Sequence, residues 1–433
     1  MRDLLRKVLR RARGGSAARA KKLLQTLVYG SIDTVVAHLP KPDAVGGVLV
    51  VRLDNIGDFI LWLRAATGLR TLFPGQRIVL AANATWASLA QQLPYWDEVI
   101  SIDLSRLKGN PLYRFRTFLA MRRRGFSVAV QPNYSRLFFL GDAVVRVSGA
   151  RERIGADGDL SNMSSAQKRI ADQWYTRLVD PGGPALTEIE HNEWFSTALG
   201  GTIANESDYR LPRVATLPEE LRLDRPYFVV FPGASWTGRR WPEASFAQVI
   251  DATCKTHDWL PVLCGSPDEF GLCDAVAAQS EAATINLAGR TSLAEFCEVV
   301  RNAELLVGND TSAIHIAAVV GTPSVCIFGG GHFGRFLPYP ASAGALAPVA
   351  VFERMPCFGC GFHCYMPHVD GQALPCVGAV SVAAVRAAME RVQASDARRH
   401  TVESCPPRQA ERDASTRSAT RHGGFERSRD GDA

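Results

Sequence analysis

The sequence predicts an α/β protein made of two Rossmann-like halves that face a central cleft. Short apolar runs rich in β-branched residues alternate with longer helical patterns, as doubly wound parallel sheets require. The alternation starts near Gly47, stops in a segment rich in prolines and charges, and restarts near Tyr227. A chain of 433 residues is also long enough for two separate cores.

The first half is expected over residues 46–210. A helix should begin near Asp58 and end at the Phe73-Pro74-Gly75 sequence, because proline and glycine stop a helix. The polar, glycine-containing stretch 151–183 lacks a clear periodicity and is expected to be a long loop. The strands predicted for this half are 47–53, 77–82, 98–102 and 126–130.

The second half is expected over residues 226–393, after an interdomain linker at about 211–226. Residues 396–433 are rich in Arg, Ser, Asp and Gly with few apolar anchors, so a disordered tail is predicted. The strands predicted here are 227–231, 260–264, 304–307 and 324–328, and the helices are 242–257, 267–280, 293–303, 311–320 and 382–393.

Residues 1–45 are predicted to be a basic N-terminal arm and linker. The first 22 residues contain nine Lys or Arg side chains against the single acid Asp3. Either this arm lies on an anionic membrane surface, or it is a solvated, frayed terminus. The apolar residues that would share one helical face of the arm are Leu4, Leu5, Val8 and Leu9.

The charge and hydropathy of the chain exclude several classes of protein. The net charge of the whole chain is +6, and residues 1–22 alone carry a larger positive charge. The remainder of the chain is therefore slightly acidic, and nucleic acid is not an expected partner. No apolar run is long enough to span a membrane, and no secretory signal is visible. A cytoplasmic protein is expected, with contact to the cytoplasmic face of an anionic inner membrane through the arm.

Four of the ten cysteines are clustered in one loop. In a cytoplasmic protein such cysteines are free thiols or metal ligands more often than disulfides. A structural zinc or iron ion is one interpretation, although a second paired Cys-x-x-Cys is absent, and packed free thiols are the alternative. The four residues are Cys357, Cys360, Cys364 and Cys376.

Two segments of the second half indicate a site for an anion. Residues 232–235 form a small-residue turn after a strand, and Arg239 and Arg240 follow it. In residues 309–312, an Asn-Asp-Thr-Ser sequence lies where a strand passes into a helix, so the helix amides and dipole would favour a diphosphate. His315, one turn further, is either a packed histidine or a catalytic one.

A carboxylate at the predicted cleft is the candidate general base. Asp58 and Asp54 both follow the first strand, and chemistry alone does not choose between them; each could instead cap the helix. Glycine-rich dinucleotide, P-loop and serine-hydrolase motifs are absent from the sequence. The alternative hypothesis of a Rossmann oxidoreductase therefore lacks the glycine-rich motif that it needs.

Three motifs in order resemble those of glycosyltransferase family 9, the bacterial heptosyltransferases. They are Arg52-x-Asp54-x-x-Gly57-Asp58, then Pro232-Gly233-Ala234 with Arg240-Trp241-Pro242, and then Asn309-Asp310-Thr311 with His315. The Glu188-x-x-His191-Asn192 segment is also similar to the family, and the whole resemblance covers about residues 46–393. It implies a GT-B fold, a nucleotide sugar held by the second half, and inverting transfer that requires no metal for catalysis.

The resemblance also implies roles for individual residues. Asp58 matches the catalytic acid of the family, Arg240 the basic residue near the diphosphate, and Glu269 is a weaker match to a ribose contact. Asp54 and His315 are expected to have supporting roles. The predicted donor-binding residues are Arg239, Arg240, Glu269, Asp310, Thr311 and Ser312.

The sequence departs from the family where the donor should bind. Ser312 stands where glycine is common, and residues 329–332 replace the usual turn after the late strand. ADP-heptose is the expected donor, with another nucleotide sugar as the alternative. The expected acceptor is a lipopolysaccharide-core or related surface glycan, and a non-catalytic nucleotide- or sugar-binding protein is the rival function.

Overall fold

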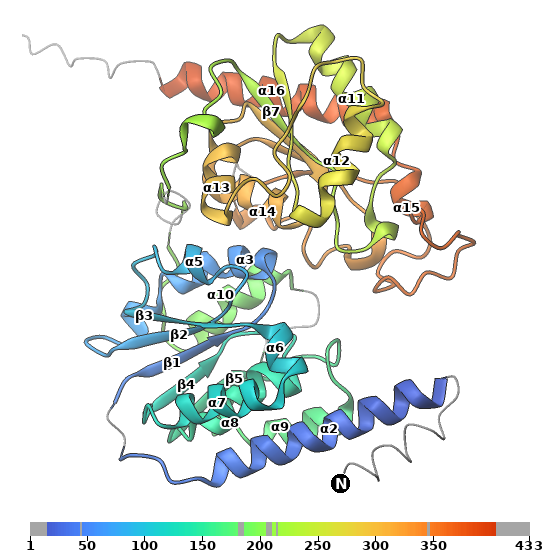
Figure 1. Ribbon diagram of the computed structural model, residues 1–433. Coiled ribbons are helices and arrows are strands. Elements are labelled where there is room, and N and C mark those ends of the chain that lie inside the picture. Colours follow the sequence, from blue (N-terminus) through green and yellow to red (C-terminus); the bar gives the residue numbers. More distant parts are fainter. Residues whose placement is uncertain are drawn as a thin grey trace, which may run out of the picture. The chain divides into compact units, whose positions relative to one another are not determined.

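The computed structural model contains two six-stranded sheets in which every strand pair is parallel (Figure 1). The first has the order β3-β2-β1-β4-β5-β6 and the second the equivalent order β12-β11-β10-β7-β8-β9. The predicted class of two Rossmann-like α/β halves is therefore confirmed. The structure describes residues 15–43, 46–180, 186–204, 210–213, 215–343 and 347–403, with only the backbone described for 15–23 and 395–403.

The four strands predicted for the first half are all present, and they form the centre and one side of its sheet. Strand β1 is completely buried and pairs with β2 on one side and β4 on the other, so the strand order reverses next to it. The strands are β1 (Val48–Arg52), β2 (Ile78–Asn83), β3 (Glu98–Ile102), β4 (Val128–Gln131), β5 (Glu152–Ala156) and β6 (Arg177–Val179).

Helices cover both faces of the first sheet, with α3 and α10 on one face and α7 and α8 on the other (Figure 1). A short π-helix, Phe138–Asp142, leads into α8. The helices are α3 (Ile56–Ala66), α4 (Leu69–Leu72), α5 (Ala87–Ala90), α6 (Leu104–Gly109), α7 (Pro111–Arg122), α8 (Ala143–Ser148), α9 (Ser165–Asp172) and α10 (Glu188–Ala198).

The prediction of a long loop over residues 151–183 was wrong. This stretch contains β5, α9 and β6. The two strands are the outer ones of the sheet, and their first residues are exposed, so they lack the continuous apolar pattern of β1. Helix α9 is short, buries only Ala171 and has few apolar residues, so its sequence resembles that of a loop.

The second half follows its predicted order of strands and helices closely. Its strands are β7 (Tyr227–Phe231), β8 (Leu260–Leu263), β9 (Ile285–Asn286), β10 (Leu305–Asn309), β11 (Ser324–Ile327) and β12 (Val349–Val351). Its α-helices are α11 (Glu243–Thr256), α12 (Phe270–Ala277), α13 (Leu293–Arg301), α14 (Ser312–Val320), α15 (Pro375–Gly378) and α16 (Val382–Glu403). Helix α16 extends to Glu403, into the segment predicted as a tail at 396–433, and residues 404–433 lie outside the described part.

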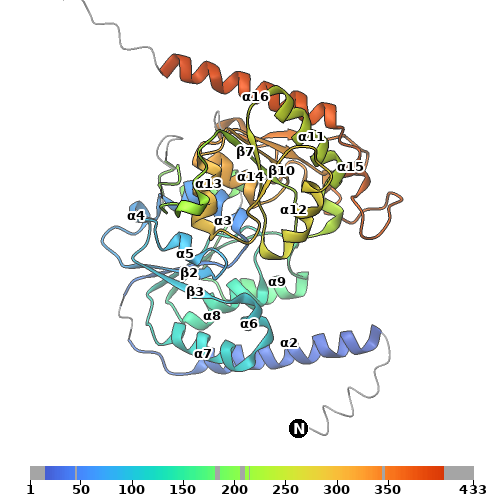
Figure 2. The ribbon, with the colours of Figure 1, turned by 45° about the horizontal axis from the view of Figure 1, so that its top comes forward.

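The predicted arm and linker also contains a long helix, α2 (Gly15–His38), which sequence analysis did not place. It lies along α7 and α8 (Figure 1, Figure 2). Asp33 of α2 forms a buried ion pair with Arg114 of α7, with Nη2 and Oδ2 2.6 Å apart. Helix α2 therefore packs on the first half through buried residues such as Tyr29, Asp33 and Val36, whereas Leu4, Leu5, Val8 and Leu9 lie outside the described residues.

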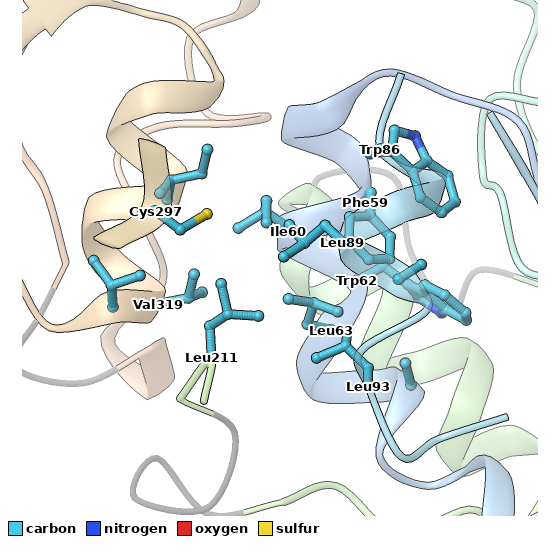
Figure 3. Close-up of a cluster of buried hydrophobic side chains, with 14 of the residues drawn as sticks. Phe59, Ile60, Trp62, Leu63, Trp86, Leu89, Leu93, Leu211, Cys297 and Val319 are labelled. Carbon is cyan, nitrogen blue, oxygen red and sulfur yellow. The ribbon is translucent and has the colours of Figure 1, made fainter. Parts of the chain in front are cut away.

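One buried hydrophobic cluster contains residues from both halves (Figure 3). Ile60 and Leu63 of α3 point toward Cys297 of α13 and Val319 of α14. Leu211, at the start of the predicted linker, lies in the same cluster, and its amide donates to the Val319 carbonyl. Apolar burial therefore holds α3 against α14, and the first residues of these two helices belong to the candidate site.

Candidate active site

Asp54 and Asp58 lie where β1 ends and α3 begins, next to the reversal of strand order. Asn55 is the N-cap residue of α3, and its amide donates a 3.3 Å hydrogen bond to Asp58 Oδ2. Asp58 is half-buried at the first turn of the helix. Asp58 therefore takes part in capping the helix, as the alternative interpretation expected. Its half-buried carboxylate also lies at the junction of β1 and α3.

Arg52, the last residue of β1, is completely buried and contacts both Asp54 and the Asp58 backbone. Its Nε lies 2.6 Å from Asp54 Oδ2, and its Nη2 donates to the Asp58 carbonyl at 3.0 Å. Asp54 Oδ2 also accepts a 2.6 Å hydrogen bond from Asn133. Asp54 is therefore fixed by an arginine and an amide, whereas the hydrogen bond to the Asp58 carboxylate comes from a backbone amide.

Three carboxylates share this region, and burial makes each negative charge costly. The third, Glu188, is the first residue of α10 and lies 3.8 Å from Arg52. The pKa of Asp58 is raised to about 6, chiefly by burial and next by the charge of Glu188, while the charge of Arg52 acts to lower it. Burial also raises the pKa of Asp54, and Arg52 opposes that shift. A carboxylate with a pKa near neutrality is well suited to accept a proton.

In the second half, Asn309 ties the end of β10 to the turn after β7. Its completely buried side chain accepts from the Trp241 amide at 3.0 Å and donates to the Pro232 carbonyl at 2.8 Å. Next to it, Arg239 donates to Asp310 Oδ2 at 2.8 Å and to the Asp310 carbonyl. The two segments that sequence analysis assigned to an anion site are therefore brought together.

The start of α14 has unsatisfied polar groups. Thr311 is the N-cap residue but makes no side-chain capping hydrogen bond, and its buried Oγ1 has no partner among the described residues. The buried Nε of Arg239 also lacks a partner in this part of the chain. Both atoms are hydrogen-bond donors beside the positive end of a helix dipole, with Ser312 next along the chain, which suits a phosphate.

Arg240 and Glu269 both contact the turn after β7. Arg240 donates through Nη2 to the Ala234 carbonyl at 2.9 Å, so its guanidinium lies against this turn. The Glu269 carboxylate occupies the space where a Cβ on Gly233 would be, and it accepts from the Ser266 amide at 2.8 Å. Glycine at 233 is therefore required for Glu269 to approach the turn.

The starts of α3 and α14 touch at Gly57. A Cβ at this position would lie 3.2 Å from the His315 ring and 3.8 Å from the Ser312 Cα. The residue before Asp58 thus contacts the helix whose start was predicted to bind a diphosphate. Close approach of two helix starts explains why glycine is needed here.

His315 is a buried, packed histidine whose partner is a side chain. Its Nδ1 lies 2.7 Å from the Tyr339 hydroxyl, and the two rings stack. Burial lowers the pKa of His315 to about 4, so the ring is neutral at physiological pH. A neutral ring cannot supply positive charge to a diphosphate, which limits His315 to hydrogen bonding and packing.

The four clustered cysteines are all free thiols. Burial raises the pKa of Cys376, and the neighbouring Cys357 contributes to the shift. No group of three or more His, Cys, Asp or Glu side chains in the described part of the chain is placed to hold a metal ion, and a structural zinc or iron ion in this loop stays a prediction. Aromatic packing fixes the loop: the Phe358 and Phe362 rings fill the spaces where Cβ atoms of residues 330 and 331 would lie.

Sequence analysis missed two residues of this region, Asn133 and Arg335. Asn133 follows β4, and Arg335 lies in the irregular segment between β11 and β12. Neither is part of a periodic pattern or a motif, so the sequence holds no local signal for them. Only the packing of separate segments brings them to Asp54 and Glu188.

Comparison with known proteins gives consistent matches. The family model described as glycosyltransferase family 9 (heptosyltransferase) matches residues 142–365. The chain is 25% identical to lipopolysaccharide heptosyltransferase 1 of Pseudomonas aeruginosa over 65% of its own length and 78% of that protein. It is 32% identical to lipopolysaccharide heptosyltransferase 3 of Escherichia coli over 63% of its own length and 80% of that protein.

Comparison of the fold with solved structures also finds a heptosyltransferase. The solved structure of E. coli ADP-heptose lipopolysaccharide heptosyltransferase II aligns with a TM-score of 0.60 at 16% identity, covering 81% of this chain and 99% of that one. At this identity the likeness concerns the fold, and it confirms the predicted GT-B arrangement of two Rossmann-like domains.

Proposed function

Because the chain belongs to glycosyltransferase family 9, we propose that it transfers heptose from ADP-heptose to a lipopolysaccharide-core or related surface glycan. The observation that carries the proposal is the contact at Gly57. It supports the proposal because the residue before Asp58 contacts α14, whose start we assign to the diphosphate. Transfer of a sugar from a nucleotide diphosphate to a hydroxyl uses a base and a diphosphate site close to each other.

In the proposed reaction, Asp58 accepts the proton of an acceptor hydroxyl. The hydroxyl oxygen forms a bond to the anomeric carbon while the bond from that carbon to the phosphate oxygen breaks, so the configuration inverts. The negative charge passes to the departing diphosphate, where the α14 amides, the Thr311 hydroxyl and the arginine pair stabilise it. Every step uses groups of this chain, and none is assigned to a metal.

Release of ADP from ADP-heptose, measured with and without acceptor, tests the function. Acceptor-dependent release that follows sugar transfer supports the proposal. Tight nucleotide binding without release would identify a non-catalytic binding protein. Turnover with another nucleotide sugar but not with ADP-heptose would keep the enzyme class and replace the donor.

Replacing Arg240 by alanine tests the assignment of the donor to the second half. Arg240 contacts the turn after β7, next to the Arg239 and Asp310 pair. Loss of a charge-assisted hydrogen bond to phosphate should weaken ADP binding by about 1.5–3 kcal/mol. Calorimetric titration with ADP measures the change, and Arg290→Ala is a control on an exposed arginine. Wild-type affinity in the Arg240 variant would place the diphosphate elsewhere.

Contact with an anionic membrane is the second part of the proposal, and α2 supports it. Residues on one side of this helix pack on α7 and α8, while others that share a helical face are exposed to solvent. The nine basic residues of segment 1–22, which overlaps the start of α2, suit an anionic surface. None of the described helices is long and apolar enough to cross a bilayer. The exposed residues are Leu24, Leu27, Val28 and Val35.

The double variant Leu27→Asp/Val35→Asp should reduce co-sedimentation with anionic vesicles at low salt, because it places two carboxylates on the exposed face of α2. Deleting residues 1–22 should also reduce it, since each basic residue near the surface contributes about 1 kcal/mol. Leu160→Asp is the matched control, because Leu160 is as exposed as Val35, at 54%. Unchanged co-sedimentation in both altered proteins would exclude this surface.

A further inference from the structure

Arg335 belongs to the second half, between β11 and β12, but its side chain reaches polar groups of the first half. Its Nη2 donates to Ser135 Oγ at 2.7 Å and to Glu188 Oε2 at 3.3 Å. Its Nη1 lies 3.6 Å from Asp159 Oδ2. One guanidinium therefore connects the loop after β4, the loop after β5 and the start of α10.

The backbone of the same residue makes a second link. The Glu188 amide donates to the Arg335 carbonyl at 2.8 Å, so both ends of Arg335 hold the first residue of α10. Further along the segment, the Ser342 carbonyl accepts from Arg64 of α3 at 3.1 Å. Tyr339, between these residues, contacts His315. Residues 332–343 thus connect the two halves beside the candidate site.

Glu188 is the charge that joins Arg335 to the catalytic region. Its side chain is only 5% exposed, and it lies between Arg52 of the first half and Arg335 of the second. Arg52 already pairs with Asp54, so Arg335 supplies much of the positive charge that balances Glu188. An uncompensated Glu188 would disfavour a second negative charge on Asp58.

We propose that Arg335 is a positioning residue for the transfer reaction, which completes the carboxylate cluster of the first half by pairing with Glu188 and Asp159. The pairing forms only when the halves are together, so it couples their closure to the ability of Asp58 to accept a proton. The inference rests on the proposed function. It adds a residue of the donor-binding half to the surroundings of the base.

The charges around Asp58 agree with this role. Burial raises the pKa of Asp58 most, followed by Glu188, whereas Arg52 and Arg335 lower it. The buried ring of His315 is neutral near physiological pH and faces Gly57 without adding charge. The titratable and charged groups on the segments packed around Asp58 are Arg52, Asp54, Asp159, Glu188, His191, His315 and Arg335, with Arg64, Glu190 and Glu193 further along α3 and α10.

Three variants test the proposal: Arg335→Gln, Arg335→Lys and, as a matched control, Arg354→Gln. Arg354 is an exposed arginine of the same half that lies over the Phe333 ring. Arg335→Gln should lower kcat/KM at pH 7 at least about tenfold, because Glu188 and Asp159 lose their charged partner. The acid limb of the pH profile should move to higher pH, because Asp58 loses a nearby positive charge. Arg335→Lys should restore the limb, and Arg354→Gln should match wild type.

A readout that needs no turnover separates this inference from the proposed function. The carboxyl ¹³C signal of Asp58, assigned by its loss in Asp58→Asn, should titrate at higher pH in Arg335→Gln than in wild type. Glu188→Gln should move the midpoint to lower pH, because it removes a nearby negative charge. This variant also tests the inference if Arg335→Gln does not fold. Unchanged midpoints in both variants would overturn the inference. Wild-type protein without transfer activity, but with these shifts, would overturn the proposed function alone.

Discussion

Asp58→Asn is expected to lower turnover about 10²–10⁴-fold while ADP affinity and melting temperature stay close to wild type. Asparagine keeps the shape of the side chain but cannot accept the acceptor proton. The amide oxygen of asparagine can still accept a hydrogen bond from the Asn55 amide, so the stability of the helix start should change little. The role of Asp58 as a base would therefore be seen in turnover, whereas a role in capping alone would leave turnover almost unchanged.

Turnover within about threefold of wild type, at unchanged donor affinity and melting temperature, would reject Asp58 as the base. Asp54 would then be the remaining carboxylate of the pair. The structure makes Asp54 the less suitable candidate, because Arg52 and Asn133 both hold its Oδ2. Asp54→Asn is accordingly expected to affect folding as well as rate.

The same assignment predicts the pH dependence of wild-type activity. The base must be ionised to accept a proton, so kcat/KM should rise as the pH increases through about 6, the pKa to which burial raises Asp58. An ordinary exposed aspartate would place this limb near pH 4. Asp58→Asn should remove the limb together with most of the activity.

Asp33→Asn is expected to destabilise the protein by about 3–5 kcal/mol, because it leaves the buried Arg114 guanidinium without its counter-ion. The two side chains form paired hydrogen bonds of 2.7 and 2.6 Å and are almost completely buried. Urea denaturation of the full chain measures the change. The control is Asp258→Asn, whose ion pair with Arg225 is exposed and should contribute no more than about 1 kcal/mol.

An equal, small effect for both variants would show that α2 does not depend on this pair. The expected result instead makes α2 part of the first half, since the helix is the source of Asp33. Loss of α2 docking should also weaken vesicle binding, because the exposed apolar face would no longer have a fixed orientation.

The inner strands could be predicted because burial on both faces gives continuous apolar runs, as in β1 and β7. Strands β5 and β6 were missed, because their exposed first residues shorten the apolar runs. Helix α2 was missed for another reason: apolar residues lie on its packed face, as Val36 does, and on its exposed face, as Leu27 does.

The candidate site shows the same division. Residues at the start of a helix carry a local signal, so Asp58 and Thr311 could be selected from the sequence. Arg335 and Glu188 meet only through tertiary packing, and 147 positions separate them in the chain. The supporting charges of a site are therefore harder to predict than the groups on its helix starts.

The anomeric configuration of the product tests the central claim most directly. Purified wild-type protein, ADP-heptose and the acceptor glycan are combined, and the product is examined by NMR of the new glycosidic linkage. Direct displacement with Asp58 as base predicts one ADP released per linkage formed and inversion of the anomeric configuration of the donor. A retained configuration, or ADP release without a new linkage, would contradict the account.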